Sequence, residues 1–226
     1  MSGPDRAPRA APGDHRLPGV LIVLEGTDRA GRSTHVRRLE QHLRYQGRGV
    51  TRTSLATSLL AADPIRAAKH QRRMDPVETV LLYAADLAER IEQVILPSLR
   101  AGLVVLADRY VYTPMARAEA RGVDAAWLER LFSFAPPPDL TLLLDVDSAT
   151  ALARQGGHAP DRYEAGMDLG LSRDTIQSFR LFQDRLRDWF EVHTERYDFQ
   201  RIDARGEPEA VATLIEPFVD ALVAAR

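Results

Sequence analysis

The sequence predicts an α/β fold with three layers, in which a five-stranded parallel sheet lies between two layers of helices. Two observations predict it. Short apolar runs of strand length recur along the chain, and segments with helical periodicity separate them. Strands and helices that alternate in this way form parallel sheets covered on both faces. The five runs occupy residues 20–25, 49–53, 103–107, 140–146 and 199–202.

Four longer segments carry apolar residues at helical spacing. The first, residues 34–45, has Val36, Leu39 and Leu43 on one face. The second, residues 77–99, follows Asp75 and Pro76, which match a helix N-cap and a proline at the first helical position. Its apolar stripe consists of Val80, Ala84, Leu87, Ile91 and Ile95, and two further helices are expected at residues 172–196 and 208–225.

Composition points to a soluble globular protein with one domain. Of the 226 residues, 45% are hydrophobic and 27% are charged, and the net charge of −2 favours neither nucleic acid nor a membrane as partner. The absence of cysteine excludes disulfides and suits a cytoplasmic protein. Residues 1–18, rich in Pro, Ala, Arg and Gly, are expected to form a disordered tail, and residues 19–226 the domain.

The first strand leads into a loop with two glycines five positions apart, Gly26 and Gly31. This spacing, followed by a cation and then Ser33, is typical of a phosphate-binding P-loop and predicts a P-loop NTPase-type fold. Backbone N–H groups of such a loop, together with the N-terminus of the next helix, bind phosphate oxygens. The nucleotide-binding stretch consists of Gly26, Thr27, Asp28, Arg29, Ala30, Gly31, Arg32, Ser33 and Thr34.

Arg32 occupies the position where the P-loop pattern has lysine. Both side chains are cationic, but lysine is a compact point charge and arginine a wide planar fork. Arginine still binds phosphate, although a small misplacement of a catalytic cation can lower the rate roughly 100-fold. The motif therefore predicts nucleotide binding and raises the question of catalytic rate. The hydroxyl of Ser33 is expected to ligate Mg²⁺.

Polar side chains follow three of the predicted strands. The P-loop follows the first, Asp108 and Arg109 follow the third, and Asp145 ends the fourth. Ligands of open parallel sheets lie beyond the carboxyl ends of the strands, which is where these groups fall. For Asp145 and Asp147, a strand-end turn is favoured over a second metal site.

Taken together, these motifs resemble those of the thymidylate kinase family of P-loop nucleoside-monophosphate kinases, over about residues 20–222. The similar stretches are Glu25-Gly-Thr-Asp-Arg-Ala-Gly31, Leu82-Tyr-Ala-Ala-Asp86, Asp108-Arg-Tyr110, the run from Pro138 to Val146, and Asp161-Arg-Tyr-Glu164. The last stretch is similar to a short lid over ATP, expected at about residues 153–167.

The resemblance implies a role for each matching residue on the donor side. Asp28 would help to organise the metal and the acceptor phosphate, and Arg29 would stabilise charge on the transferred phosphoryl group. Asp108 would hold the metal or its waters, and Arg162 would close over ATP. Asp108 could instead form a strand-end ion pair with Arg109, and Arg162 could be a surface charge.

On the acceptor side, the resemblance implies that Arg109 holds the acceptor phosphate and that Tyr83 stacks on the base, unless Tyr83 is core packing. Here the chain departs from the family. Arg52-Thr-Ser-Leu-Ala-Thr57 replaces an Arg-Glu-Pro-Gly-Gly-Thr-like stretch, which leaves Arg52 as an acceptor-binding candidate. Leu87 stands where an arginine is expected, and Arg90 could substitute for it. The basic segment 69–73 is a solvated linker or a further phosphate clamp.

The expected activity is transfer of the γ-phosphoryl group of ATP to a nucleoside monophosphate, with dTMP as the first candidate, in nucleotide biosynthesis. ATP and Mg²⁺ are the expected cofactors. The resemblance also implies a homodimer, for which the helix at residues 77–99 is a candidate interface. Three alternatives stay open: a kinase of this fold with another phosphorylated acceptor, a nucleotide-binding regulator with little turnover, and an ATPase that acts on nucleic acid.

Overall fold

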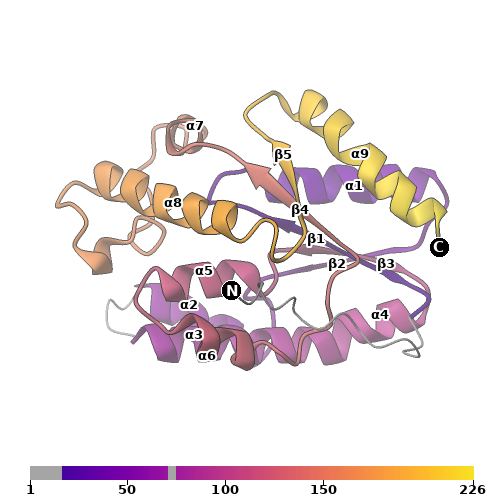
Figure 1. The fold of residues 1–226 in the computed structure, drawn as a ribbon, viewed down its shortest axis with the longest axis horizontal. Helices are drawn as coiled ribbons and strands as arrows, with labels where there is room; N and C mark the ends of the chain where they lie inside the picture. Colours follow the sequence, from indigo (N-terminus) through magenta and orange to yellow (C-terminus); the bar gives the residue numbers. More distant parts are fainter. Residues whose placement is uncertain (1–16, 71–74) are drawn as a thin grey trace, which may run out of the picture.

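A computed structural model describes residues 17–70 and 75–226 of the chain. Its centre is a five-stranded sheet in the order β2-β3-β1-β4-β5, and every neighbouring pair of strands is parallel (Figure 1). The predicted fold class is therefore confirmed. The strands are β1 (Val20–Glu25), β2 (Val50–Ser54), β3 (Val104–Asp108), β4 (Leu140–Asp145) and β5 (Phe199–Asp203).

Strand β1 lies in the middle of the sheet, between β3 and β4. Leu24 is in register with Asp108 of β3 and with Leu142 of β4. Because all strands run the same way, the segments that follow β1, β3 and β4 emerge at the same edge. The topology thus brings the loop after Glu25 next to Asp108 and Arg109, as the sequence predicted.

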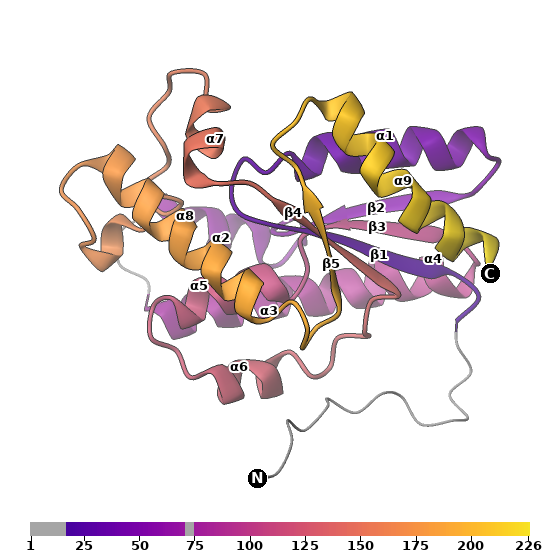
Figure 2. The same cartoon turned by 45° about the horizontal axis from the view of Figure 1, so that its top comes forward.

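Two apolar cores cover the two faces of the sheet, because alternate residues of each strand point to opposite sides. In β1, Leu21 and Val23 face one core, and Val20, Ile22 and Leu24 face the other. Figures 1 and 2 show α1 and α9 on one face and α3, α4 and α5 on the other. The helices are α1 (Arg32–Tyr45), α2 (Ala62–His70), α3 (Pro76–Arg90), α4 (Leu96–Arg100), α5 (Tyr112–Glu119), α6 (Ala125–Leu131), α7 (Ser148–Ala153), α8 (Thr175–Val192) and α9 (Pro208–Ala224).

The helix predicted at residues 77–99 is continuous, but it is not α-helical throughout. A π-helical turn, η1 (Ile91–Ile95), joins α3 to α4. Pro97 lies two residues after this turn, and a proline inside a helix has no N–H to donate and clashes with the carbonyl four residues earlier. A π turn provides the local widening that such a residue requires. Asp75 caps the start of α3 by accepting from the Val77 N–H at 2.7 Å, as predicted.

The sequence located the strands to within about one residue and missed the short helices α2, α5, α6 and α7. Helices α6 and α7 are only seven and six residues long, which is too short for periodicity to reveal. The predicted tail falls almost wholly outside the described residues, and so does most of the basic segment at residues 69–73. In the part of the chain that the structure describes, no helix is both long and apolar enough to cross a membrane.

Candidate active site

The loop between β1 and α1 has the backbone conformation that a P-loop needs. Gly26 and Gly31 have φ angles of 140° and 94°, a region that favours glycine. A Cβ at Gly26 would lie 2.5 Å from the Leu144 carbonyl oxygen, so no side chain fits there. Helix α1 begins at Arg32, directly after the loop, so its N-terminal N–H groups and its positive dipole end meet at the loop.

A cavity of about 570 Å³ opens at this edge of the sheet. Its lining combines the P-loop, the ends of β2 and β3, helix α5 and the segment after α7. Five arginines face it against three carboxylates, a surplus of positive charge that suits phosphate groups. The lining residues are Asp28, Arg29, Gly31, Arg32, Ser33, Thr34, Ser54, Leu55, Ala56, Asp108, Arg109, Arg117, Arg154 and Glu164.

Arg32 is buried and fills its position with a set of contacts that a lysine could not reproduce. One terminal nitrogen donates to the Gly26 carbonyl oxygen at 2.7 Å and also to the Thr27 carbonyl oxygen. Nε donates to Asp108 Oδ1 at 3.1 Å. The planar fork therefore ties the P-loop to the end of β3, while its charge stays at the cavity wall.

Asp108 and Ser33 form the pair that could hold a divalent metal. The Ser33 hydroxyl donates to Asp108 Oδ2 at 2.5 Å. A hydroxyl and a carboxylate are oxygen ligands of the kind that Mg²⁺ prefers, and Mg²⁺ commonly uses one or two carboxylates plus substrate phosphates. Within the described residues, no group of three or more His, Cys, Asp or Glu could hold a metal by itself. The donor set therefore fits a Mg²⁺ ion that is shared with phosphates.

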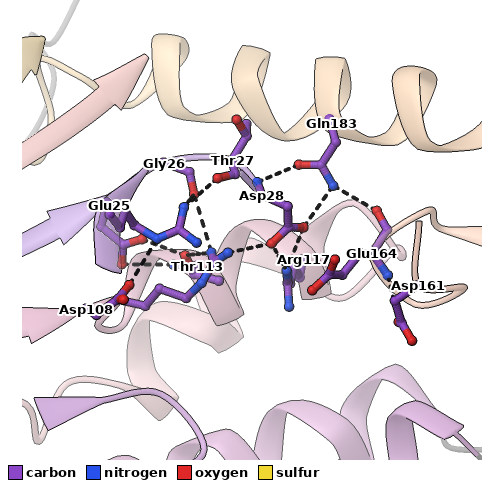
Figure 3. A network of polar contacts seen from close by, with 12 residues as sticks. Glu25, Gly26, Thr27, Asp28, Asp108, Thr113, Arg117, Asp161, Glu164 and Gln183 are labelled. Atoms are coloured by element: carbon purple, nitrogen blue, oxygen red, sulfur yellow. Dashed lines mark hydrogen bonds and ion pairs between the residues drawn. The ribbon is translucent and has the colours of Figure 1, made fainter. Parts of the chain in front are cut away.

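Asp28 lies at the centre of a buried network of polar contacts (Figure 3). Its carboxylate accepts from Arg109 at 2.5 Å and from Arg117 at 2.7 and 2.8 Å. It also accepts from the Gln183 amide at 2.9 Å. Asp108 and Arg109 therefore do not pair with each other: the first pairs with Arg32 and the second with Asp28.

The charges of this network set its pKa values. Burial alone would raise the pKa of Asp28, but the guanidinium groups of Arg117, Arg109 and Arg32 hold that pKa well below its usual range. Burial and the neighbouring Arg32 lower the pKa of Arg109 to about 10. For Arg117, burial lowers the pKa, but the attractions of Asp28, Tyr83, Tyr163 and Glu164 together outweigh burial and raise it. Asp28 thus stays ionised while two arginines face it.

Glu25 positions Arg109 by holding the turn that follows β3. Its carboxylate, fully buried, accepts from the N–H groups of Tyr110 and Thr113 at 2.8 and 3.3 Å and from the Thr113 hydroxyl at 2.5 Å. These bonds hold the turn after β3, where Arg109 has a φ of 71°. Arg109 in turn donates to the Thr113 hydroxyl at 2.7 Å. A strained residue that its surroundings hold in place is common at functional sites.

Of the four predicted acceptor residues, Arg109 lines the cavity, and the other three do not. Arg52 is paired with Glu40 of α1 at 2.9 Å. Tyr83 is buried in a small cluster with Ala61 and Ile65, as the core-packing alternative expected. Arg90 is buried as well: it donates to the Thr53 hydroxyl at 2.8 Å and to Asp86 at 3.3 Å.

On the lid, Arg162 is exposed and does not line the cavity, whereas Glu164 does. Burial and the nearby Asp28 raise the pKa of Glu164. Sequence reasoning missed Arg117, Arg154 and Gln183 as site residues. One feature of the sequence could have pointed to Arg117: arginine is an unexpected residue type at this position after the Asp-Arg-Tyr motif. No such feature pointed to Arg154, which donates to the Arg29 carbonyl oxygen at 3.3 Å.

The fold and the loop together define a class: this is an α/β protein of the P-loop NTPase type, with a cavity built for phosphate groups. Comparison with known families identifies it further. The model of the thymidylate kinase family matches residues 24–215. The chain belongs to the thymidylate kinase family.

Individual relatives agree with this assignment. A protein of Saccharolobus solfataricus described as probable thymidylate kinase 2 is 34% identical over 188 residues, which cover 82% of this chain and 88% of the relative. The thymidylate kinase of Geobacter sulfurreducens is 32% identical over 206 residues, or 87% of this chain and 94% of the relative. The thymidylate kinase of Leifsonia xyli is 41% identical over 153 residues, or 65% and 72% of the two chains.

Proposed function

We propose that this protein transfers the γ-phosphoryl group of ATP to dTMP and forms dTDP and ADP. The observation that carries the proposal is the cavity, which a P-loop and five arginines line in a chain of the thymidylate kinase family. The relatives named above support dTMP as the acceptor. Family membership also favours a kinase over a regulator without turnover.

The donor phosphates bind to the backbone N–H groups of the P-loop and the N-terminus of α1. Arg32 contributes its charge from the position in which it holds the Gly26 and Thr27 carbonyl oxygens. Arg29 and Arg154 line the same cavity and face the phosphates there, and Arg162 approaches the donor when the lid closes. Positioning and charge neutralisation are the main means by which proteins catalyse phosphoryl transfer.

In the reaction, an oxygen of the dTMP phosphate attacks the γ-phosphorus, and the bond from that phosphorus to the bridging oxygen of ADP breaks. Arg109 holds the attacking phosphate, and Asp28 keeps Arg109 and Arg117 in place through short hydrogen bonds. Ser33 and Asp108 would hold a Mg²⁺ ion, which would neutralise phosphate charge when bound. The lid excludes water, which would otherwise hydrolyse ATP.

The acceptor base lies toward β2 and α3. Leu87, which replaces the arginine expected there, is buried in the apolar core. Arg90 is the candidate that replaces its function, because its Nη2 has no hydrogen-bond acceptor among the described residues. A buried donor without a partner is costly, and a base carbonyl would satisfy it.

The proposal includes a cytoplasmic location and a homodimer formed through α3. Val77 and Leu81 of this helix are 40% and 46% exposed, which supports a role in association. Sedimentation velocity at several protein concentrations tests the dimer: a single monomeric species at every concentration rejects it.

The activity is tested by incubating the protein with ATP and Mg²⁺ and separate dTMP, dUMP, dCMP, dGMP, dAMP and ribonucleotide samples. Controls contain ATP alone or no enzyme. Conversion of dTMP to dTDP above all other acceptors is the expected result. Conversion of another acceptor, or none by a protein that binds ATP, contradicts the proposal.

A further inference from the structure

Gln183 joins the P-loop to the lid through a single side chain. It lies on α8, is only 1% exposed, and is 155 residues away from Asp28 in the sequence. Its Oε1 accepts from the Asp28 N–H at 2.8 Å. Its Nε2 donates to Asp28 Oδ2 at 2.9 Å and to the Glu164 carbonyl oxygen at 2.8 Å. Figure 3 shows the amide between these two partners.

The contacts determine which way the amide faces. The amide oxygen of Gln183 accepts from one N–H group, and both N–H groups of the amide donate to oxygen atoms. If the amide were rotated by half a turn, its oxygen would face two other oxygens and its NH₂ group would face the Asp28 N–H. A glutamate of the same size lacks the two donors.

The lid segment that Gln183 contacts is docked and not free. The Ala165 carbonyl oxygen accepts from the Ser178 hydroxyl of α8 at 2.8 Å. Arg121, in the turn after α5, donates to the Tyr163 carbonyl oxygen at 3.2 Å and pairs with Asp168 at 2.7 Å. Residues 163–168 are thus fixed to α8 and to the turn after α5, and Gln183 is the point at which this docked segment meets the P-loop.

The other end of the bridge is the carboxylate that organises the reacting site. Asp28 faces Arg109 and Arg117, and Gln183 holds it through both its backbone N–H and its side chain. A shift of Gln183 therefore moves Asp28 and, with it, both arginines. Misplacement of catalytic groups by about 1 Å can lower a rate about 100-fold.

From these contacts we infer that Gln183 is a positioning residue, which couples the docked lid segment to Asp28 and so aligns Arg109 for phosphoryl transfer. The inference rests on the proposed function and deepens it. Gln183 does not line the cavity. Its effect passes through Asp28, so removing it should change kcat more than it changes substrate binding.

The main test is Gln183→Met, which keeps the length of the side chain and removes its hydrogen bonds. We expect kcat to fall by about 10- to 100-fold, while KM for ATP and for dTMP changes by less than about threefold. ATP hydrolysis per dTDP formed should rise, because the lid is held less firmly. Gln177→Met is the matched control, since Gln177 is exposed on the same helix. Gln183→Glu, which keeps size and polarity, should lose at least as much activity and serves if the Met variant fails to fold.

A second readout does not depend on the acceptor. Hydrogen exchange is followed with and without the non-hydrolysable analogue adenylyl imidodiphosphate and Mg²⁺. We expect the analogue to slow exchange at Asp28 and at residues 163–168 in the wild-type protein, and to leave residues 163–168 unchanged in Gln183→Met.

Equal slowing in both proteins, or a kcat of folded Gln183→Met within twofold of wild type, overturns the inference. A change confined to KM overturns it as well. If the wild-type protein forms no dTDP, the proposed function fails. The exchange experiment then still tests whether Gln183 couples the docked lid segment to Asp28.

Discussion

Arg32 shows how a departure from a motif is accommodated at the scale of one residue. A lysine at this position would place one ammonium group among the acceptors. The guanidinium instead reaches three, namely the Gly26 and Thr27 carbonyl oxygens and Asp108. The substitution thus adds a contact to the end of β3 and keeps the cation next to the phosphates.

Substitutions at Arg32 should separate the contribution of its charge from the contribution of its planar shape. Arg32→Lys should keep at least about a tenth of the activity, because the charge remains near the loop. Arg32→Ala should lower the rate by about 100-fold and stability by about 3 kcal/mol, because Asp108 loses its cationic partner and keeps only the Ser33 hydroxyl. Steady-state kinetics and urea unfolding measure both effects.

Arg37→Lys is the matched control, since Arg37 is exposed on the same helix. If Arg32→Lys were faster than wild type at unchanged ATP affinity, the arginine would limit the chemistry. If Arg32→Ala kept full activity, Arg32 would have no role in transfer.

At the scale of single residues, site residues could be predicted where they belong to one motif of fixed spacing. Site residues that act through tertiary contacts were missed. Gly26, Asp28 and Ser33 lie within one motif and could be found. Arg117 and Gln183 lie 89 and 155 residues from Asp28, with which they pair. No local pattern relates such positions, so only the fold brings them together.

The lid shows a division at the scale of one element. The sequence predicted a single lid at about residues 153–167, whereas the structure divides this region in two. Gly156 and Gly157 have open space around them. Gly166 packs against the ring of Phe182, and a Cβ there would lie 2.7 Å from it. The first half is open to solvent and the second half is docked.

This division gives a prediction with a closely matched control. Gly156 and Gly166 have φ angles of 66° and 60°, so an alanine meets similar backbone strain at both. Only Gly166→Ala adds a clash with Phe182, and it should lower stability by about 2 kcal/mol more than Gly156→Ala does. The melting temperatures and kcat of the two variants measure this. Equal effects at the two glycines would show that the second half of the lid is not docked.

Strands and long helices could be predicted because their period extends over many residues. The docking of residues 163–168 could not, because it depends on Ser178 and Gln183 of α8 and on Arg121 in the turn after α5. The acceptor residues were also placed imperfectly. Arg52 was a candidate from its position beside the altered stretch, but its strand register turns it toward Glu40.

At the scale of the whole molecule, the buried charges around Asp28 join parts of the chain that are distant in sequence. The P-loop, the turn after β3, helix α5 and helix α8 all meet at this carboxylate. The free energy of unfolding therefore depends on its ionisation.

Asp28→Asn should reveal this linkage. The pKa of Asp28 is depressed in the folded protein, so its stabilisation is present above the usual aspartate pKa of about 3.9 and lost as the pH falls below it. The variant should be less stable than wild type by about 3 kcal/mol at pH 7, with a difference that shrinks toward pH 3. Urea unfolding at several pH values measures it.

Asp63→Asn is the control, because the Asp63 side chain is 85% exposed and forms a surface ion pair with Arg66. Its effect should be close to zero at every pH. A stability difference for Asp28→Asn that is constant or grows on acidification would contradict the assigned ionisation.

The π turn at Ile91–Ile95 has a consequence for chain length. Four residues of this helix are buried on one face although the chain separates each from the next by four positions: Leu87, Ile91, Ile95 and Leu99. In an unbroken α-helix, each step of four would advance about 40° beyond a full turn, and Leu99 would lie about 120° away from Leu87. The wider turn absorbs this excess. The helix therefore contains one residue more than an α-helix between the same end points needs, and this turn is where a single-residue deletion disturbs the core least.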